Sequence, residues 1–229
     1  MTSQNNTFYL VATPIGNLED ITHRALRILS EVDIVLCEDT RMTQKLLNHY
    51  EIKVKTQSYH AQASDLKEDK ILEEIKNGVT FALVSDAGTP TISDPGVKLI
   101  SRIRSDSPET QIISIPGATA LITALSTTGF TGNQFTFYGF LPHKKGRSSI
   151  FDEIEASNRV SIFYESPHRL LKTLEELSKR FGTKRNICVA RELTKIYEET
   201  PVFNAQEMYD YFTHNPDRVR GECVIIINK

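Results

Sequence analysis

Short apolar runs alternate along the chain with segments in which apolar residues recur every three to four positions. The runs predict β-strands and the periodic segments predict α-helices. The run "FYLVA" (8–12), for example, precedes a helical pattern at 18–32. Asn17 is a natural N-cap for that helix, and Asp20 stands where the carboxylate of a capping box would stand. Alternation of this kind indicates the α/β fold class.

The same reading extends over the whole chain. The first half has predicted strands at 8–12, 33–38, 55–60, 80–85 and 111–116, and predicted helices at 18–32, 40–50, 65–78, from Pro95 onward and at 118–129. The second half has predicted strands at 135–140, 159–165, 186–192, 197–203 and 221–228, and predicted helices at 147–157, 167–182 and 205–213. The turn-rich stretch 128–134 separates the halves. We therefore expect an α/β domain at 1–128 with a parallel-type sheet and another at 129–229 with a mixed sheet.

Composition narrows the classes of protein that remain. The 229 residues carry a formal net charge of -2, which gives no global attraction to nucleic acid, so any RNA contact must come from a local patch. Cys37, Cys188 and Cys223 lie far apart without a C-x-x-C pair, which argues against disulfides and structural zinc and predicts buried or inert thiols. No His/Cys/Asp/Glu set has convincing metal spacing.

The first residues and the lengths of the apolar runs predict a cytoplasmic protein with no membrane segment. The first residues, MTSQNN, offer neither the basic region nor the apolar core of a secretion signal. No apolar run approaches the length that spans a bilayer.

Three loops follow predicted strands of the first half: "VATPIGN" (11–17), "SDAGTPTISDPG" (85–96) and "IPGAT" (115–119). Open α/β sheets bind ligands at such strand ends. Neither G-x-G-x-x-G nor a P-loop is present, so a nucleotide-like ligand would bind in another way. Asp94 as N-cap and Pro95 at the first helical position explain one Ser-Asp pair of the second loop. For its first five residues, ligand binding and plain turn structure are equally good explanations. The three loops adjoin only if their strands are neighbours.

The stretch "FYESPHRLL" (163–171) is of a different kind, because it sets titratable groups at a strand end and on the first turn of a helix. Glu165 and His168 could share proton transfer while Arg169 holds an anion. Ser166 and Pro167 already account for the start of the helix, which favours a functional role for the other residues.

Basic side chains gather in two places, for which a solvated loop is the plainer alternative. "LPHKKGRSS" carries His143, Lys144, Lys145 and Arg147, and a second cluster consists of Arg180, Lys184 and Arg185. The strand end "CEDTR" (37–41) carries Glu38, Asp39 and Arg41, for which an internal ion pair or a solvated turn is the plainer alternative.

Seven segments together resemble, in chain order, the ribosomal-RNA branch of the tetrapyrrole methylase superfamily of S-adenosylmethionine-dependent enzymes. They are "YLVATPIGNLEDIT", "VLCEDTR", "LVSDAGTPTISDPG", "PGATA", "YGFLP", "FYESPHRL" and "ARELTK". The resemblance spans about residues 8 to 228. It implies two α/β domains with S-adenosylmethionine in the cleft between them, a homodimer, and 2'-O-methylation of a cytidine of 16S rRNA in the decoding region of the small ribosomal subunit.

The resemblance also implies site residues. For the cofactor these are Pro14, Ser85, Asp86, Ala87, Thr89, Thr119, Ala120, Phe163, Tyr164 and Gly221. Our hypothesis makes Glu165 or His168 the general base, with no metal required, and assigns Arg41, Lys144, Lys145, Arg147 and Arg169 to RNA. Members commonly continue into a small helical C-terminal domain, whereas this chain stops at Lys229, which gives the basic loop more weight.

Two other functions compete with this one. The first is a methyltransferase of the same fold that acts on a tetrapyrrole or another small acceptor. The second is a catalytically silent RNA-binding or ribosome-assembly module. The concentration of polar groups at the strand ends counts against the silent module.

Overall fold

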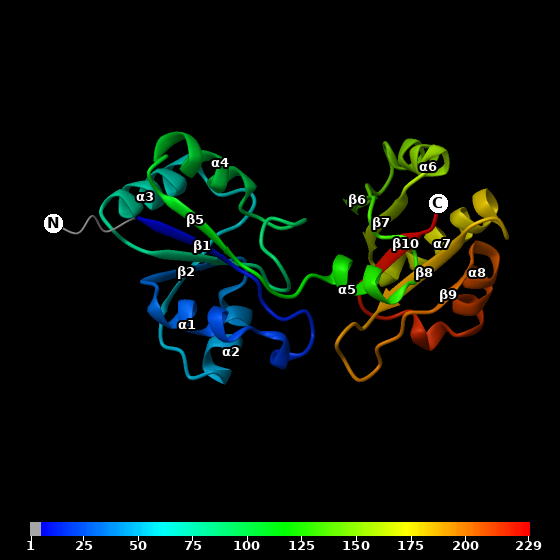
Figure 1. The fold of residues 1–229 in the computed structure, drawn as a ribbon, viewed down its shortest axis with the longest axis horizontal. Coiled ribbons are helices and arrows are strands. Elements are labelled where there is room, and N and C mark those ends of the chain that lie inside the picture. The colour runs from blue at the N-terminus through cyan, green and yellow to red at the C-terminus, as the bar shows by residue number, and fades with distance from the viewer. Residues whose placement is uncertain (1–5) are drawn as a thin grey trace. The chain divides into compact units, whose positions relative to one another are not determined.

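The computed structural model describes residues 6–229. Residues 1–5, which belong to the segment predicted to lack a secretion signal, lie outside them. The chain divides into two compact units, the first ending at Thr119 and the second comprising Ala120–Lys229 (Figure 1). The division falls before the helix α5 (Ala120–Thr127), not in the turn-rich stretch after it, because α5 packs on a strand of the second unit. Among the described residues, no helix is long and apolar enough to cross a membrane.

The first unit is built on a parallel sheet with the strand order β3-β2-β4-β1-β5. Its strands are β1 (Thr7–Val11), β2 (Ile34–Cys37), β3 (Lys55–Ser58), β4 (Phe81–Val84) and β5 (Gln111–Ile115). Its helices are α1 (His23–Glu31), α2 (Thr40–His49), α3 (Asp65–Lys76) and α4 (Val97–Asp106). β2 and β4 are buried at every position, as expected for central strands of a sheet covered on both faces.

Helices cover both faces of this sheet. Apolar residues of α1 and α2, including Ile28 and Leu47, pack with Val35 and Val84 in one core. α3 and α4 pack with the opposite side chains of the same strands in a second core that contains Ile71. Figure 1 shows the two helix pairs on opposite sides of the sheet.

The strand order brings the predicted loops together. β1 lies between β4 and β5, in parallel with both, and β2 lies on the other side of β4. The carboxyl ends of these strands therefore meet at one edge of the sheet. This confirms the condition under which the loops after β1, β4 and β5 adjoin, and it adds "CEDTR", which follows β2.

The second unit carries a mixed sheet with the order β6-β7-β10-β8-β9, in which β6 and β7 are parallel and the other pairs are antiparallel. Its strands are β6 (Phe135–Phe140), β7 (Val160–Glu165), β8 (Asn186–Arg191), β9 (Val202–Asn204) and β10 (Cys223–Ile227). Its core is formed with α6 (Arg147–Ala156), α7 (Pro167–Phe181) and α8 (Ala205–His214).

Two helix starts differ from the prediction. The helix expected from residue 18 begins at His23, because Thr22 is extended and its hydroxyl accepts the Ala25 N–H, and Asn17 caps only a 3-10 turn at Leu18–Asp20. The helix expected from Pro95 begins at Val97 after Gly96, whose φ of 124° only glycine adopts readily. Asp94 and Pro95 are therefore not its N-cap and first residue.

Candidate functional site

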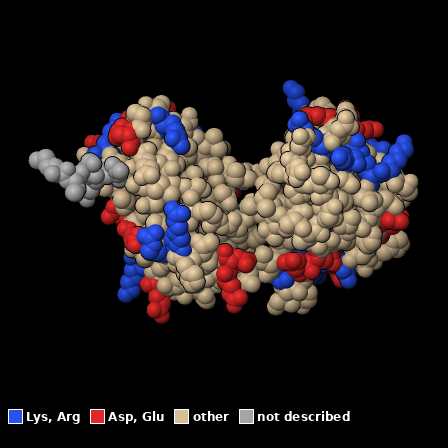
Figure 2. All heavy atoms as spheres, viewed as in Figure 1, with Lys and Arg blue, Asp and Glu red and all other residues tan. Residues whose placement is uncertain are grey.

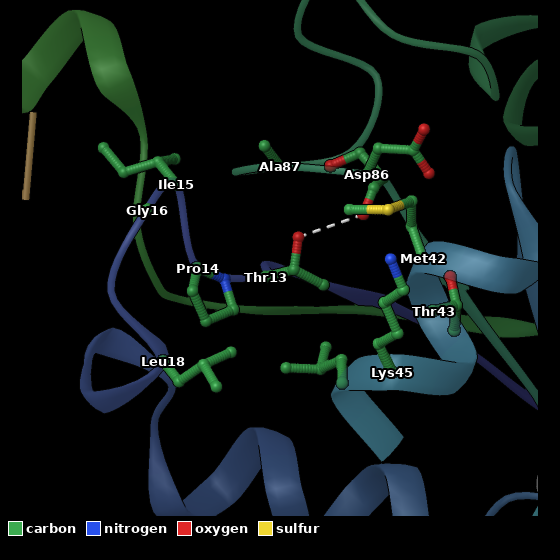
Figure 3. Close-up of a pocket in the computed structure, with 12 residues that line it drawn as sticks. Thr13, Pro14, Ile15, Gly16, Leu18, Met42, Thr43, Lys45, Asp86 and Ala87 are labelled. Carbon is green, nitrogen blue, oxygen red and sulfur yellow. Dashed lines mark hydrogen bonds between the residues drawn. The ribbon is translucent and has the colours of Figure 1, made fainter. Parts of the chain in front are cut away.

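A pocket of about 300 Å³ opens at the carboxyl edge of the first sheet (Figure 3). It is bounded by the loop after β1, one side of α2 and the loop after β4. The described residues that line it are Thr13, Pro14, Ile15, Gly16, Leu18, Met42, Thr43, Lys45, Leu46, Ser85, Asp86 and Ala87. The volume lies at the lower end of the range typical of small-molecule sites, about 300–1,000 Å³.

Hydrogen bonds join the two loops that form the floor of the pocket. Thr13 and Gly88 exchange backbone hydrogen bonds of 2.9 and 3.0 Å. The Thr13 hydroxyl donates to the Ser85 carbonyl at 3.0 Å, and the Ser85 hydroxyl donates to the Gly88 carbonyl at 2.9 Å. Thr13 and Ser85 are buried, so these bonds form in a dry environment and fix the loops in one arrangement.

The loop after β5 is in close contact with the loops after β4 and β1. The Thr89 hydroxyl donates to the Ala118 carbonyl at 3.0 Å. A Cβ on Gly117 would lie 2.7 Å from the Cβ of Ala12, so only glycine allows this approach. Gly88 has a φ of 86°, which favours glycine for its backbone conformation. The three strand-end loops thus form one rigid surface.

The segment that leads from the pocket floor to α4 is strained. Thr91 and Ser93 have φ values of 72° and 65°, in the left-handed region that residues other than glycine rarely adopt. Because the helix starts only at Val97, helix initiation does not account for this conformation. Backbone strain of this kind concentrates at functional sites.

A carboxylate on the pocket rim connects β4 to α2. Asp86 accepts the backbone N–H of Asp39 at 3.1 Å. Asp39 in turn accepts the Arg41 backbone N–H at 2.8 Å and pairs with the Arg41 guanidinium at 2.7 Å. The guanidinium lowers the pKa of Asp39 to about 2, so the pair stays charged at neutral pH. The internal ion pair considered for "CEDTR" is present.

The structure brings together four residues of the predicted cofactor set, Pro14, Ser85, Asp86 and Ala87. Asp86 and Ala87 are exposed at the pocket, whereas the buried Ser85 hydroxyl donates its hydrogen bond within the loop, to the Gly88 carbonyl. Sequence reasoning missed the contribution of α2, which supplies Met42, Thr43, Lys45 and Leu46. One residue could have pointed to this role of α2. Met42 is an apolar side chain on a polar face of the predicted helix, and in the structure it is 47% exposed.

The other cofactor residues lie at the end of the first unit or in the second. Thr119 and Ala120 are half-buried at the division between the units. Phe163 is fully buried in the core of the second unit, so its side chain has no surface to offer, whereas the half-buried Tyr164 ring lies 5.3 Å from Phe140. Gly221 has a φ of 69° and abuts Glu192. Their contact with a cofactor stays a prediction.

Glu165 sits at the centre of a buried ionic cluster. Its side chain is fully buried, and one carboxylate oxygen accepts Arg147 Nη2 at 2.8 Å and Thr173 Oγ1 at 2.7 Å. The other oxygen accepts the Ser166 backbone N–H at 2.9 Å and is ion-paired with Arg169 Nε at 2.7 Å. Both oxygens are occupied, and the cluster ties the end of β7 to the starts of α6 and α7. This arrangement favours a structural role over proton abstraction.

The predicted RNA residues of the second unit separate into two classes. Lys144 and Lys145 are exposed in the loop before α6. Arg147 and Arg169 turn inward to Glu165 and donate to the carbonyls of Pro142 and Leu141, which leaves them 17% and 18% exposed. His168 is exposed beside the cluster. On the face shown in Figure 2, Lys and Arg form several separate groups, the densest of them on the second unit in the region of α6, and they do not form one continuous basic surface.

The cysteines are buried, as predicted, and burial raises the pKa values of Cys188 and Cys223 to about 12. Within residues 6–229, no group of three or more His, Cys, Asp or Glu is arranged to hold a metal ion.

The chain is similar in sequence and in fold to known methyltransferases. The family model described as Tetrapyrrole (Corrin/Porphyrin) Methylases matches residues 7–208. "Ribosomal RNA small subunit methyltransferase I" of Haemophilus influenzae is 42% identical over 99% of this chain and 80% of its own length, and the protein of the same name from Thermotoga maritima is 42% identical over 96% of each. Uroporphyrin-III C-methyltransferase from Thermus thermophilus, solved with S-adenosylhomocysteine, shares the fold with a TM-score of 0.64 at 16% identity, covering 97% of each chain. The chain belongs to the tetrapyrrole methylase family and, within it, to the group of relatives named ribosomal RNA small subunit methyltransferase I.

Proposed function

We propose that the protein transfers a methyl group from S-adenosylmethionine to the 2'-hydroxyl of a cytidine of 16S rRNA in the decoding region of the small ribosomal subunit. The observation that carries the proposal is the 42% identity, over 99% of the chain, to a relative named for methylation of small-subunit rRNA. The homodimer and the cytoplasmic location belong to the same proposal and rest on the resemblance of the sequence motifs.

The pocket at the strand ends supports methyl transfer. Its floor is fixed by the Thr13, Ser85 and Gly88 hydrogen bonds, so a bound donor would meet a surface that does not need to reorganise. The Asp86 carboxylate is exposed on the pocket rim and offers a negative charge to the cationic donor. Holding two reactants in line supplies about 7–11 kcal/mol in favourable cases, and a rigid floor serves that purpose.

The reaction is a displacement at the methyl carbon. The 2'-oxygen forms a bond to that carbon while the carbon–sulfur bond breaks, and the electron pair of that bond remains on sulfur. S-adenosylhomocysteine leaves as a neutral thioether, and the hydroxyl proton passes to a base. A positioned general base contributes about 10² to 10⁴ in rate.

Of the two candidate bases, His168 is the more accessible. It is exposed, whereas Glu165 is fully buried and both of its oxygens are engaged. We assign Glu165 as a positioning residue that fixes the start of α7, which carries His168. Lys144 and Lys145 remain the RNA contacts of the second unit, because Arg147 and Arg169 are held inside.

The proposal is tested by incubating small ribosomal subunits from cells that lack the enzyme with labelled S-adenosylmethionine. Label in a cytidine ribose of 16S rRNA is the expected result. Transfer only to a tetrapyrrole or another small acceptor would establish the competing function.

A further inference from the structure

A polar groove of about 410 Å³ runs along the exposed side of α2, next to the pocket. Lys45 lines both the groove and the pocket, so the two cavities meet at one cationic side chain. The groove is lined by Thr40, Arg41, Gln44, Lys45 and Asn48 of α2 and by Thr56 of β3.

Helical spacing places these side chains on one face. Arg41 and Lys45, like Gln44 and Asn48, are four residues apart, while the buried Thr43 and Leu47 lie on the other side of the helix. Gln44 Nε2 donates to Asn48 Oδ1 at 2.8 Å, which sets the two amides side by side. Cations, amides and hydroxyls are the side chains with which proteins contact phosphates and sugars of nucleic acids, independently of sequence.

The two cations of the groove are not equivalent. Arg41 is paired with Asp39, so much of its charge is neutralised locally. Lys45 has no carboxylate within ion-pair distance among residues 6–229, and it extends from α2 toward Thr13 and Asp86 (Figure 3). Its positive charge therefore remains available to an anion where the groove enters the pocket.

We propose that the α2 groove binds the phosphodiester backbone of single-stranded RNA next to the nucleotide being methylated, with Lys45 contacting the phosphate nearest the acceptor ribose. The proposal rests on the proposed function, because it takes the pocket as the place of the donor and its mouth as the place where the acceptor ribose meets the methyl group. A nucleotide inside an RNA chain carries a phosphodiester on each side of its ribose, so a ribose at that mouth brings a phosphate to the cation of Lys45. Leu18 and Met42, exposed at 39% and 47%, give the base an apolar surface.

Lys45→Ala tests this inference, with Lys45→Arg as the conservative variant and Lys70→Ala as the matched control. Lys70 is an exposed lysine of α3, which covers the opposite face of the same sheet. Binding of an oligocytidylate is measured by fluorescence anisotropy as a function of salt. Lys45→Ala is expected to raise Kd about 3- to 10-fold. It is also expected to reduce the slope of log K against log salt by about 0.7, the value for one phosphate contact on a single strand.

The same variants separate this inference from the proposed function. With small subunits as substrate, Lys45→Ala is expected to raise KM by about the same factor as the Kd for the oligocytidylate, with a smaller effect on kcat, and Lys45→Arg is expected to restore KM. Wild-type KM and salt slope in Lys45→Ala, with an active wild-type enzyme, would overturn the α2 groove alone. A wild-type protein that neither binds the oligocytidylate nor methylates subunits would overturn the proposed function and the groove with it.

Discussion

At the scale of single residues, burial separates structural groups from those that face a substrate. Glu165 and His168 stand three residues apart and look equally suited to proton transfer in the sequence. In the structure one is enclosed between two guanidinium groups and the other is exposed. Sequence could place Glu165 at the end of a strand and His168 on the first turn of the next helix, but it could not reveal that Arg147, eighteen positions from Glu165, turns inward to the carboxylate.

Glu165→Ala is therefore expected to lower the stability of the protein, and His168→Ala is expected to lower the rate of methylation. Removing the Glu165 carboxylate leaves Arg147 and Arg169 without their partner, and breaking such a buried pair costs about 3–5 kcal/mol of unfolding free energy. His168→Ala is expected to keep wild-type stability and to lower single-turnover methylation about 10² to 10⁴-fold. Urea denaturation and single-turnover kinetics with saturating cofactor check both. A Glu165→Ala protein of wild-type stability would contradict the structural role, and a wild-type rate in His168→Ala would exclude it as the base.

The buried thiols predict how stability changes in alkaline solution. Burial raises the pKa values of Cys188 and Cys223 from 9.0 to about 12, so the folded state keeps both protonated after the unfolded chain has begun to lose its protons. Their contribution is fully present below pH 9 and is lost as the pH rises toward 12. The loss is at most about 1.4 kcal/mol per pH unit for each thiol.

Urea denaturation at pH 9, 10 and 11 measures this slope. Cys188→Ala provides the control, because it removes one thiol from the titration and is expected to flatten the slope. A free energy of unfolding that stays constant over this pH range would contradict the prediction.

At the scale of elements, the sequence predicted most strands and helices, since their periodicity is set by burial on the sheet. The prediction was wrong where the local backbone conformation sets the first residue of a helix or the extent of a strand. Thr22 and Gly96 start their helices later than Asn17 and Asp94 suggested, and "YEETPVF" forms a strand only at its end, Val202–Asn204. The strand-end loops were identifiable, but the role of α2 depends on the strand order, which a single sequence does not specify.

The loop after β4 offers an element-scale test through two glycines with positive φ. Gly88 has a φ of 86° and exchanges hydrogen bonds with Thr13, whereas Gly129 has a φ of 70° and would give an added Cβ open space. Alanine in the left-handed region costs about 1–2 kcal/mol at either position. Only at Gly88 does relaxation of that strain act on the hydrogen bonds with Thr13 in the pocket floor.

We therefore expect Gly88→Ala to raise the Kd for S-adenosylmethionine by about tenfold or more, which corresponds to about 1.4 kcal/mol of binding energy. Gly129→Ala is expected to bind the donor as the wild type does while showing a similar loss of stability. Calorimetric titration gives both affinities. Equal donor affinity in the two variants would show that the Thr13–Gly88 floor does not hold the donor.

At the scale of the whole molecule, the chain joins a parallel α/β unit to a unit with a mixed sheet, as the density of predicted strands indicated. Net charge gave no sign of an RNA partner, and the basic side chains on the face shown in Figure 2 form separate groups, so we expect any RNA contact to be local. The α2 groove and the loop with Lys144 and Lys145 are the local candidates. The α2 groove could be found only from the structure, because residues of α2 and of β3 line it together.

The most direct test of the account is to map the methylated nucleotide. Small subunits from cells that lack the enzyme are incubated with the purified protein and labelled S-adenosylmethionine, and the 16S rRNA is then hydrolysed in alkali. A 2'-O-methyl group prevents cleavage of the neighbouring phosphodiester, because the 2'-oxygen can no longer attack it. The account predicts one labelled, alkali-resistant dinucleotide that contains a cytidine of the decoding region. Label on a base, or no label in 16S rRNA while the protein binds the donor, would contradict it.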